Sequence, residues 1–534
     1  MIEKVKNIRQ KSMKTSIINH QSSIFHYLCA QNERPRRLKC SQMLFNSLPF
    51  LLFFPVVCVV YYCIPGSWLR LRNLFLLAAS YYFYMNWEPA YALLLLTSTV
   101  VTYASALGIA GCTVHSTSSA RAVHSTSSAR EGGKRKAWLV ASLVLNLSLL
   151  VAFKYYNFLS SSLVALMDCC GVSMEIPVSK LLLPVGISFY TFQALGYTID
   201  VYRGTTSVER DVWTYALFVS FFPQLVAGPI ERSNNLLPQF KQVHRLDYDD
   251  GMTGLRMMVW GYFLKLVVAD RCGDYVNAVF NHLDMHNGGS YAVAALLFPF
   301  QIYGDFAGYS LIAIGAARIL GFRLMENFRR PYLSCSVGEF WHRWHISLST
   351  WFKDYVYIPL GGNRVSRPRQ YWNLMVTFVV SGLWHGANWT FLCWGALHGM
   401  LLCIEKAVRL PTLMRRAWWP GEQVSRLGRW LLTFVLVSLA WVFFRADTLA
   451  DVCIIFKGIV TRPGVPFIRV SDFMIIGVSL VVLLVDGLRR ERQRPLPVTG
   501  PVRTVLLHVG LALMIAVITL FGVLDSSQFI YFQF

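Results

Sequence analysis

The sequence is poor in acidic residues and in charge altogether. Asp and Glu number 28 against 50 Lys and Arg, charged residues make up 15% of the chain, and the formal net charge is +22. In a soluble protein such an excess would indicate a nucleic-acid partner. Here the basic residues gather in the connections between apolar runs, as at 134–136 and 364–369. Cytoplasmic loops of membrane proteins are enriched in Lys and Arg, so we expect no nucleic-acid partner.

The sequence also lacks the patterns of several kinds of site. Its 12 cysteines include no CxxC pair and only one adjacent doublet, Cys169-Cys170. That scatter supports neither a zinc site nor a disulfide framework. No P-loop, no nucleophile elbow and no dinucleotide fingerprint in a suitable context is present. We therefore expect no resident cofactor and no metal ion.

Long apolar runs dominate what is present. Hydrophobic residues make up 55% of the chain, and many runs approach or reach the roughly 20 residues that a helix needs to cross a bilayer. The runs lie at 48–65, 90–111, 137–153, 214–230, 290–322, 430–444, 473–485 and 505–524. We predict an all-α polytopic membrane protein with about ten to twelve transmembrane helices, some of them broken or re-entrant.

Two polar segments stand apart from these runs. Residues 1–42 are basic and lack the apolar core of a signal peptide. We expect a disordered cytoplasmic tail or an extension upstream of the true start, with the transmembrane domain over 43–534. Residues 114–122 and 123–131 repeat VHSTSSAR in tandem. We interpret 112–136 as a polar loop, because such loops tolerate insertions.

The segment 323–371 is too polar to span a membrane but is dense in Trp, Phe and Tyr. Aromatic rings mixed with Arg and Lys are typical of segments at the membrane–water interface. Apolar residues recur at near-helical spacing over 337–357. We predict one or two short amphipathic helices on the cytoplasmic side, followed by a turn at PLGGNR (359–364).

The stretch SGLWHGANWT (381–390) places a histidine inside an apolar segment. If it is helical, Ser381, His385 and Asn388 share one face, and Trp384 adjoins His385. We interpret Ser381, Trp384 and Asn388 as candidates for the wall of a substrate tunnel. Glycines spaced four apart let neighbouring helices approach, so we expect His385 to face the bundle interior or a watered tunnel. Burial favours the neutral imidazole, which can accept a proton. A histidine satisfied by a backbone carbonyl is the structural alternative.

A second histidine cluster lies in EFWHRWH (339–345), where Glu339, His342 and His345 are spaced three apart. Metal binding would need further carboxylates from other helices, and few are available. We interpret His345, which precedes the hydroxyl-bearing ISLST, as a candidate at a reaction centre. His342 is a candidate for the wall of the substrate tunnel.

Asp305 is a further polar candidate for the tunnel. It lies between Gly304 and Gly308, which suggests a kinked or broken helix that lines a cavity. A buried partner for an arginine is the alternative. The segments 183–204 and 221–233 are interrupted by Gly, Pro and polar residues and could line the same cavity.

Several of these segments together resemble one family. LPVGISFYTFQALGYTIDVYRG (183–204), SFFPQLVAGPIER (220–232), EFWHRWHISLSTWFKDYVYIPLGGNR (339–364) and VVSGLWHGANWTFLCWGALHG (379–399) look like the membrane-bound O-acyltransferases. More narrowly, they look like the branch of alginate O-acetyltransferase membrane subunits. The resemblance runs in order from Met43 to the C-terminus.

The resemblance implies a ring of helices around a tunnel, with funnels from both membrane faces meeting near a family histidine that matches His385. A second polar position of the family matches His345. The implied substrates are a cytoplasmic thioester such as acetyl-CoA and an exopolysaccharide such as alginate or another envelope glycan. The implied setting is the bacterial inner membrane, with an extracytoplasmic acetyltransferase as partner protein. Relatives carry an acidic residue where this chain has Leu311, so that carboxylate's contribution is lost or supplied elsewhere.

Three functions are compatible with these patterns. In an acyltransferase, His385 would deprotonate the acceptor hydroxyl, and His345 or nearby donors would stabilise the oxyanion. Some relatives transfer D-alanine to teichoic acid or modify peptidoglycan, and the sequence does not select the acceptor. In a transporter or flippase of an envelope precursor, the polar groups would bind the translocated substrate. A scaffold subunit that has lost activity is the third possibility.

Overall fold

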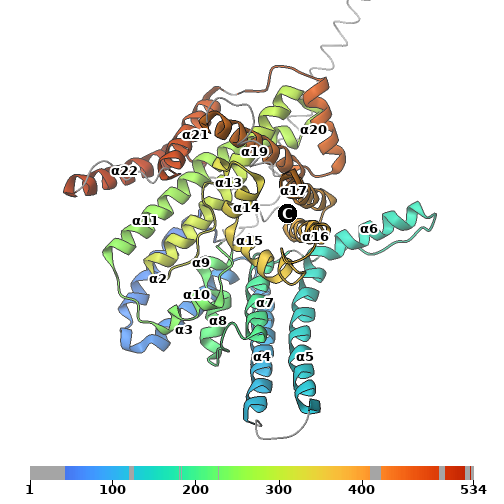
Figure 1. Ribbon diagram of the computed structural model, residues 1–534. Helices are drawn as coiled ribbons and strands as arrows, with labels where there is room; N and C mark the ends of the chain where they lie inside the picture. The colour runs from blue at the N-terminus through green and yellow to red at the C-terminus, as the bar shows by residue number, and fades with distance from the viewer. Residues whose placement is uncertain are drawn as a thin grey trace, which may run out of the picture. The chain divides into compact units, whose positions relative to one another are not determined.

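Helices make up all the regular structure in the ranges that the computed structural model of this protein describes (Figure 1). Those ranges are 43–118, 125–179, 181, 183–226, 228–408, 422–468, 470–491, 500–523 and 530. They contain no β-strand, in agreement with the predicted all-α class. Contacts divide the chain between Gln42 and Met43. The predicted N-terminal extension, 1–42, lies outside the described residues.

The domain consists of long helices joined by short helical pieces. The long helices are α2 Leu48–Cys63, α3 Leu69–Met85, α4 Tyr91–Ser118, α5 Ser125–Leu150, α6 Tyr156–Cys169, α7 Ile187–Arg203, α11 Tyr248–Tyr262, α12 Asp270–Phe280, α13 Gly288–Ile319, α16 Arg367–His385, α17 Trp389–Val408, α19 Glu422–Arg445, α20 Leu449–Thr461, α21 Val470–Glu491 and α22 Gly500–Phe521. The short pieces are η1 Gly66–Trp68, η2 Val151–Tyr155, α8 Val212–Ser220, α9 Phe222–Leu225, α10 Ser233–Leu236, η3 Gln239–Lys241, η4 Phe263–Ala269, η5 Leu283–Met285, η6 Pro331–Leu333, α14 Val337–Arg343, α15 Ile346–Phe352 and η7 Lys353–Tyr357. Three of these pieces, η2, η4 and η7, are π-helical turns.

Seven helices in the described ranges are long and apolar enough to cross a membrane, or eight if the bent pair α2 and α3 forms one span. This is fewer than the ten to twelve predicted. The apolar run 214–230 is divided into α8, of 9 residues, and α9, of 4 residues, and neither is long enough to span. Helix α13 is not among the seven; neighbouring helices bury most of it, and polar residues such as Asp305 interrupt its apolar run.

Helices α4 and α5 extend into the segment predicted to be a loop. The expected loop covered 112–136, but α4 continues to Ser118 and α5 begins at Ser125. The two helices form the hairpin drawn in blue in Figure 1. The prediction failed because a polar composition marks residues as solvated, and a helix that continues beyond the apolar layer is solvated as well.

Helix α13 is continuous through Asp305, so it is not broken there. A Cβ atom on Gly308 would lie 2.7 Å from the carbonyl oxygen of Gly261, and one on Gly304 would lie 2.8 Å from that of Leu264. These glycines therefore let α13 pack directly against α11 and η4.

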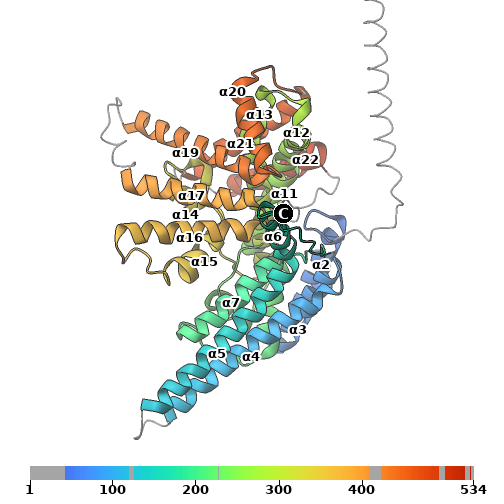
Figure 2. The same cartoon turned by 90° about the vertical axis from the view of Figure 1, so that its right-hand side faces the viewer.

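Helices α16 and α17 also cross closely, as the glycine spacing predicts. A Cβ atom on Gly382 would lie 2.3 Å from the carbonyl oxygen of Phe391, and one on Gly395 would lie 2.3 Å from that of Phe378. Figure 2 shows α16, α17 and α19 side by side. This crossing places the C-terminal end of α16, with Trp384 and His385, within the packed helices.

Candidate functional site

His345 occupies a strained turn between two short helices. The side chain of Ser336 caps α14 by accepting a hydrogen bond from the backbone nitrogen of Glu339 at 3.0 Å, and α14 ends at Arg343. His345 then has φ 41° and ψ 57°, the left-handed region, and precedes α15. Such a backbone costs about 1–3 kcal/mol for a residue other than glycine and is found mostly at functional sites.

This turn breaks the face that Glu339, His342 and His345 were predicted to share. Glu339 accepts a hydrogen bond from the backbone nitrogen of Cys335 and forms an ion pair with Arg343 at 2.5 Å. His342 is exposed, which does not support its predicted place in the wall of a tunnel. In the described ranges, no group of three His, Cys, Asp or Glu side chains is arranged to hold a metal ion.

Asn327 holds the strained turn from the outside. Its carbonyl oxygen accepts a hydrogen bond from the backbone nitrogen of Ile346 at 2.9 Å. Its side chain donates to Ser310 Oγ of α13 at 3.1 Å and accepts from Ser347 Oγ at 3.0 Å. Ser347 Oγ in turn accepts from the backbone nitrogen of Ile230. Three separate segments are thereby tied to the residues that flank His345.

The His345 side chain is fully buried among aromatic rings. Its exposed fraction is 0%. Its ring centroid lies 4.6 Å from that of Phe306, 6.0 Å from Trp384, and 6.4 Å from Phe189, Phe328 and His385. Neither ring nitrogen has a hydrogen-bond partner within the part of the chain that the structure describes. A buried polar group without a partner is costly, so we interpret this histidine as a functional group.

His385 is the last residue of α16. Gly386 follows with φ −156° and ψ 149°, and a Cβ atom on it would lie 2.1 Å from the ring of Phe391. The helix therefore ends there, and Asn388 does not share a helical face with His385. Asn388 instead accepts a hydrogen bond from the backbone nitrogen of Thr390 and donates to the carbonyl of Asp447 at 2.8 Å. Its predicted place in the tunnel is not supported.

The imidazole of His385 lies in the same aromatic surroundings as that of His345. His385 is 2% exposed, and its ring centroid lies 4.9 Å from Trp384, 5.1 Å from Trp394 and 5.4 Å from Phe444. The two imidazoles, 6.4 Å apart between centroids, come from different elements. Neutral imidazoles buried this way can take a proton from one reacting atom and donate one to another.

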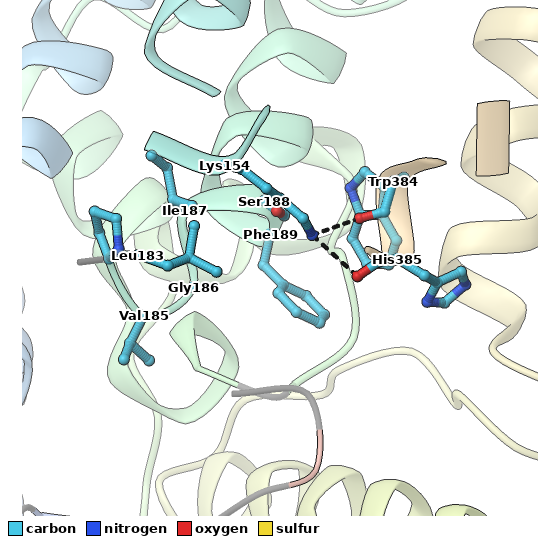
Figure 3. Close-up of a pocket in the computed structure, with 10 residues that line it drawn as sticks. Lys154, Leu183, Val185, Gly186, Ile187, Ser188, Phe189, Trp384 and His385 are labelled. Carbon is cyan, nitrogen blue, oxygen red and sulfur yellow. Dashed lines mark hydrogen bonds between the residues drawn. The ribbon is translucent and has the colours of Figure 1, made fainter. Parts of the chain in front are cut away.

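A cavity of about 60 Å³ lies against the end of α16 (Figure 3). Its lining includes Lys154, Gly186, Phe189, Trp384 and His385. In Figure 3 the ammonium group of Lys154 lies between this cavity and the last carbonyls of α16, and the His385 imidazole points away from Lys154.

The remaining predicted site residues divide into two groups. Trp384 lines the cavity and packs edge-on against Phe189, and its role in a substrate tunnel stays a prediction. Ser381 is buried in α16 but is not among the residues that line the cavity. Asp305 pairs with Lys265 at 2.6 Å, so its partner is a lysine and it does not line this cavity.

Leu311, where the family resemblance implies an acidic residue, lies away from this cavity. It is half-buried on α13 and lines a second, larger cavity of about 650 Å³ between α13, α19 and α21. Phe328 lines the same cavity and stacks on His345. Its ring therefore lies between this larger cavity and the His345 imidazole. The substitution therefore changes the wall of the larger cavity and leaves the first contacts of both histidines unchanged.

Sequence reasoning missed Lys154 and Asn327. Lys154 follows the apolar run 137–153, where a lone lysine usually marks the end of a span, but the helical span continues from Glu131 to Cys169. Asn327 lies in the polar segment 323–371, where nothing in the local pattern distinguishes it. For Lys154, its position inside an otherwise apolar span was the signal that could have marked it as functional.

Comparison with known proteins identifies the family of this chain. The pattern of the membrane-bound O-acyltransferase family matches residues 211–444. The chain is 42% identical to the probable alginate O-acetylase AlgI of Azotobacter vinelandii, over 76% of each chain. It is 38% identical to the Pseudomonas aeruginosa protein of that name, over 86% of this chain and 84% of the relative.

A third relative carries a different name. The peptidoglycan O-acetyltransferase of Helicobacter pylori is 33% identical, over 81% of this chain and 83% of the relative. Identities at this level over most of both chains establish common descent. The chain is a multi-pass integral membrane protein and belongs to the membrane-bound O-acyltransferase family.

Proposed function

We propose that this O-acyltransferase moves an acetyl group from a cytoplasmic acyl thioester, acetyl-CoA or another, across the bacterial inner membrane. The acceptor is a hydroxyl of an exopolysaccharide such as alginate or of another cell-envelope glycan. The names of the relatives from Azotobacter vinelandii and Pseudomonas aeruginosa support alginate, and that of the Helicobacter pylori relative supports an envelope glycan more broadly. The structural observation that carries the proposal is the buried pair of His345 and His385.

His385 acts as the general base in this proposal. Its neutral imidazole takes the proton of the acceptor hydroxyl as the hydroxyl oxygen attacks the thioester carbonyl. A new carbon–oxygen bond forms, the carbon–sulfur bond breaks, and the proton passes from the imidazolium to the departing thiolate. His345, whose ring nitrogens have no hydrogen-bond partner among the described residues, donates a hydrogen bond to the oxyanion.

An extracytoplasmic acetyltransferase is the proposed partner protein. Donor and final acceptor lie on opposite sides of the bilayer, so a hydroxyl group has to meet the thioester inside the membrane domain. That hydroxyl belongs either to the glycan or to a serine of the partner, which then passes the acetyl group on.

The test uses purified protein in vesicles of phosphatidylethanolamine and phosphatidylglycerol, with acetyl-CoA labelled in the acetyl group. Unacetylated alginate oligosaccharides and peptidoglycan fragments are supplied as acceptors. We expect label in an ester of the acceptor, and we expect the variant His385→Ala to insert normally and transfer none. Movement of glycan across the vesicle without covalent label would favour a transporter. Full transfer by His385→Ala would overturn the mechanism.

A further inference from the structure

The C-terminal end of α16 requires unusual support because it lies inside the domain. The last four carbonyls of an α-helix have no partner within the helix, and at this end they belong to residues 382–385. Buried carbonyls without partners are costly. The backbone nitrogen of Gly386 satisfies only the first, that of Gly382, at 3.3 Å.

The other three carbonyls are satisfied by two adjacent side chains from a different helix. Tyr155 Oη donates to the carbonyl of Leu383 at 3.0 Å. Lys154 Nζ donates to the carbonyl of Trp384 at 2.6 Å and to that of His385 at 3.1 Å. Figure 3 shows both bonds of Lys154. The end of α16 is thus capped completely, and the cap comes from the span 131–169.

The local backbone explains how Lys154 and Tyr155 reach this position. Both lie in the π-helical turn η2, which joins α5 to α6. A π-turn inserts one extra residue into a helix, shifts the direction of the side chains on it, and is found often at functional sites. Here the turn presents two consecutive side chains to the same helix end.

A lysine suits this position better than a neutral donor. Its ammonium group has three donors and carries a positive charge, which interacts favourably with the negative end of the helix dipole. Its Nζ atom also lies 5.8 Å from the centroid of the Trp384 ring, within range of a cation–π contact. A charge in this setting is held by several partners, and removing it affects the geometry of His385 first.

We infer that Lys154 is a positioning residue of the transfer reaction. It holds the backbone of Trp384 and His385 so that the His385 imidazole is directed toward His345 and away from the cavity that Lys154 lines. Lys154 does not touch the reacting atoms in this account. The inference rests on the proposed function, because it assigns the transfer chemistry to His385.

The experiment compares Lys154→Met with Lys154→Arg in vesicles. We expect Lys154→Met to lower kcat for acetyl transfer by about 10- to 100-fold, since a misplacement of about 1 Å costs that much. The KM for acetyl-CoA should stay within twofold. Lys154→Arg, which keeps a charged donor, should recover most of the lost rate. Tyr155→Phe, which removes one neutral hydrogen bond, should have a smaller effect.

Lys136→Met is the matched control, because Lys136 is an exposed lysine of the same long helix. It should keep the wild-type kcat. A wild-type kcat in Lys154→Met would overturn the inference. So would equal losses in Lys154→Met and Lys154→Arg that follow the amount of folded protein, because that result describes a purely structural lysine.

A second measurement separates this inference from the proposed function. Hydrogen exchange of the backbone over 380–388 should be faster in Lys154→Met than in the wild type, with exchange in α13 unchanged. This result does not depend on activity. If the wild type transferred no acetyl group, the proposed function would fail while the exchange data still reported on Lys154. Unchanged exchange at the end of α16 would overturn the positioning role itself.

Discussion

Two buried polar clusters in this domain differ in how their groups are paired. In the first, Lys265 Nζ lies 2.8 Å from Asp270 Oδ1 and 2.6 Å from Asp305 Oδ1, and all three side chains are at most 8% exposed. In the second, His345 and His385 lie 6.4 Å apart among aromatic rings. Within the described residues, the His345 ring nitrogens have no hydrogen-bond partner.

The difference shows which cluster maintains the fold and which is available for chemistry. The lysine and the two carboxylates satisfy one another, and Asp305 Oδ2 also accepts a hydrogen bond from the backbone nitrogen of Ile530 at 2.7 Å. The charges of these groups therefore compensate each other within the protein. A histidine that keeps its nitrogens unpaired can exchange protons and hydrogen bonds with one. Asp305 and the two histidines were all candidates from sequence, and only their partners distinguish them.

Lys265→Met should have the largest effect on stability. It leaves two buried carboxylates next to each other without the ammonium group that compensates them, and breaking a buried ion pair costs about 3–5 kcal/mol. We expect a marked loss of folded protein, measured by thermal unfolding in detergent. Asp305→Asn keeps the pair of Lys265 with Asp270 and should be milder. Equal stability of Lys265→Met and the wild type would show that the triad is not structural.

In the second cluster, His345→Asn should reduce activity more than any other substitution except one of His385. Asparagine tolerates the left-handed backbone, so the turn is kept while the imidazole is lost. We expect kcat for acetyl transfer to fall about 10²- to 10³-fold, as for loss of one oxyanion donor, with unfolding unchanged.

A third buried histidine provides the matched control. His398 Nδ1 accepts a hydrogen bond from Trp341 Nε1 at 3.3 Å, whereas neither nitrogen of His345 has a partner in the described ranges, and we predict a structural role for His398. His398→Gln should lower the free energy of unfolding by about 1 kcal/mol and leave kcat unchanged. Loss of kcat in His398→Gln, with loss of stability alone in His345→Asn, would show that His398 is the functional histidine and His345 the structural one.

Asn327→Ala should have an intermediate effect. It removes the bonds to Ser310 and Ser347 and leaves those hydroxyls less well satisfied, at a cost of about 1–3 kcal/mol. Because these bonds hold the turn at His345, we expect kcat to fall about tenfold as well. Loss of stability with an unchanged kcat would show that the hydrogen bonds of Asn327 do not act through His345.

The fold was largely predictable from sequence, because apolar runs and interfacial aromatic residues are local signals. The sequence also singled out the two histidines, since ionisable residues in apolar segments are rare; the structure places them close together, and their catalytic role stays a prediction. The end of α16 was not predicted. Glycine at 386 is compatible with a helix and with the extended backbone that it adopts in the structure, so the residue type alone does not fix the end of α16.

The other features that the sequence did not predict also depend on contacts between distant segments. The lysine partner of Asp305 and the carbonyl partners of Lys154 are far away in sequence, at Lys265 and at the end of α16. The position of Leu311 beside a second cavity also depends on how α13, α19 and α21 pack. No periodicity within one segment carries that information, so the partners of a polar residue, and therefore its role, required the structure.

Glu491→Gln should have the smallest effect, because this carboxylate is partly solvated. Hydrogen bonds from Arg343 hold the pKa of Glu491 below its ordinary value of 4.5. Its contribution to stability is therefore complete above about pH 4.5 and is lost as the pH falls through the lower folded value. We expect the melting temperature of the wild type to drop more steeply than that of the variant on acidification. Parallel curves would contradict this.

The most direct test measures melting temperature and acetyl transfer together in His385→Gln and Lys265→Met. For His385→Gln we expect the wild-type melting temperature and a loss of transfer of at least about 100-fold. For Lys265→Met we expect a lower melting temperature, with near-normal transfer for each folded molecule. Wild-type transfer by His385→Gln would contradict the assignment of the reaction centre to the histidine pair.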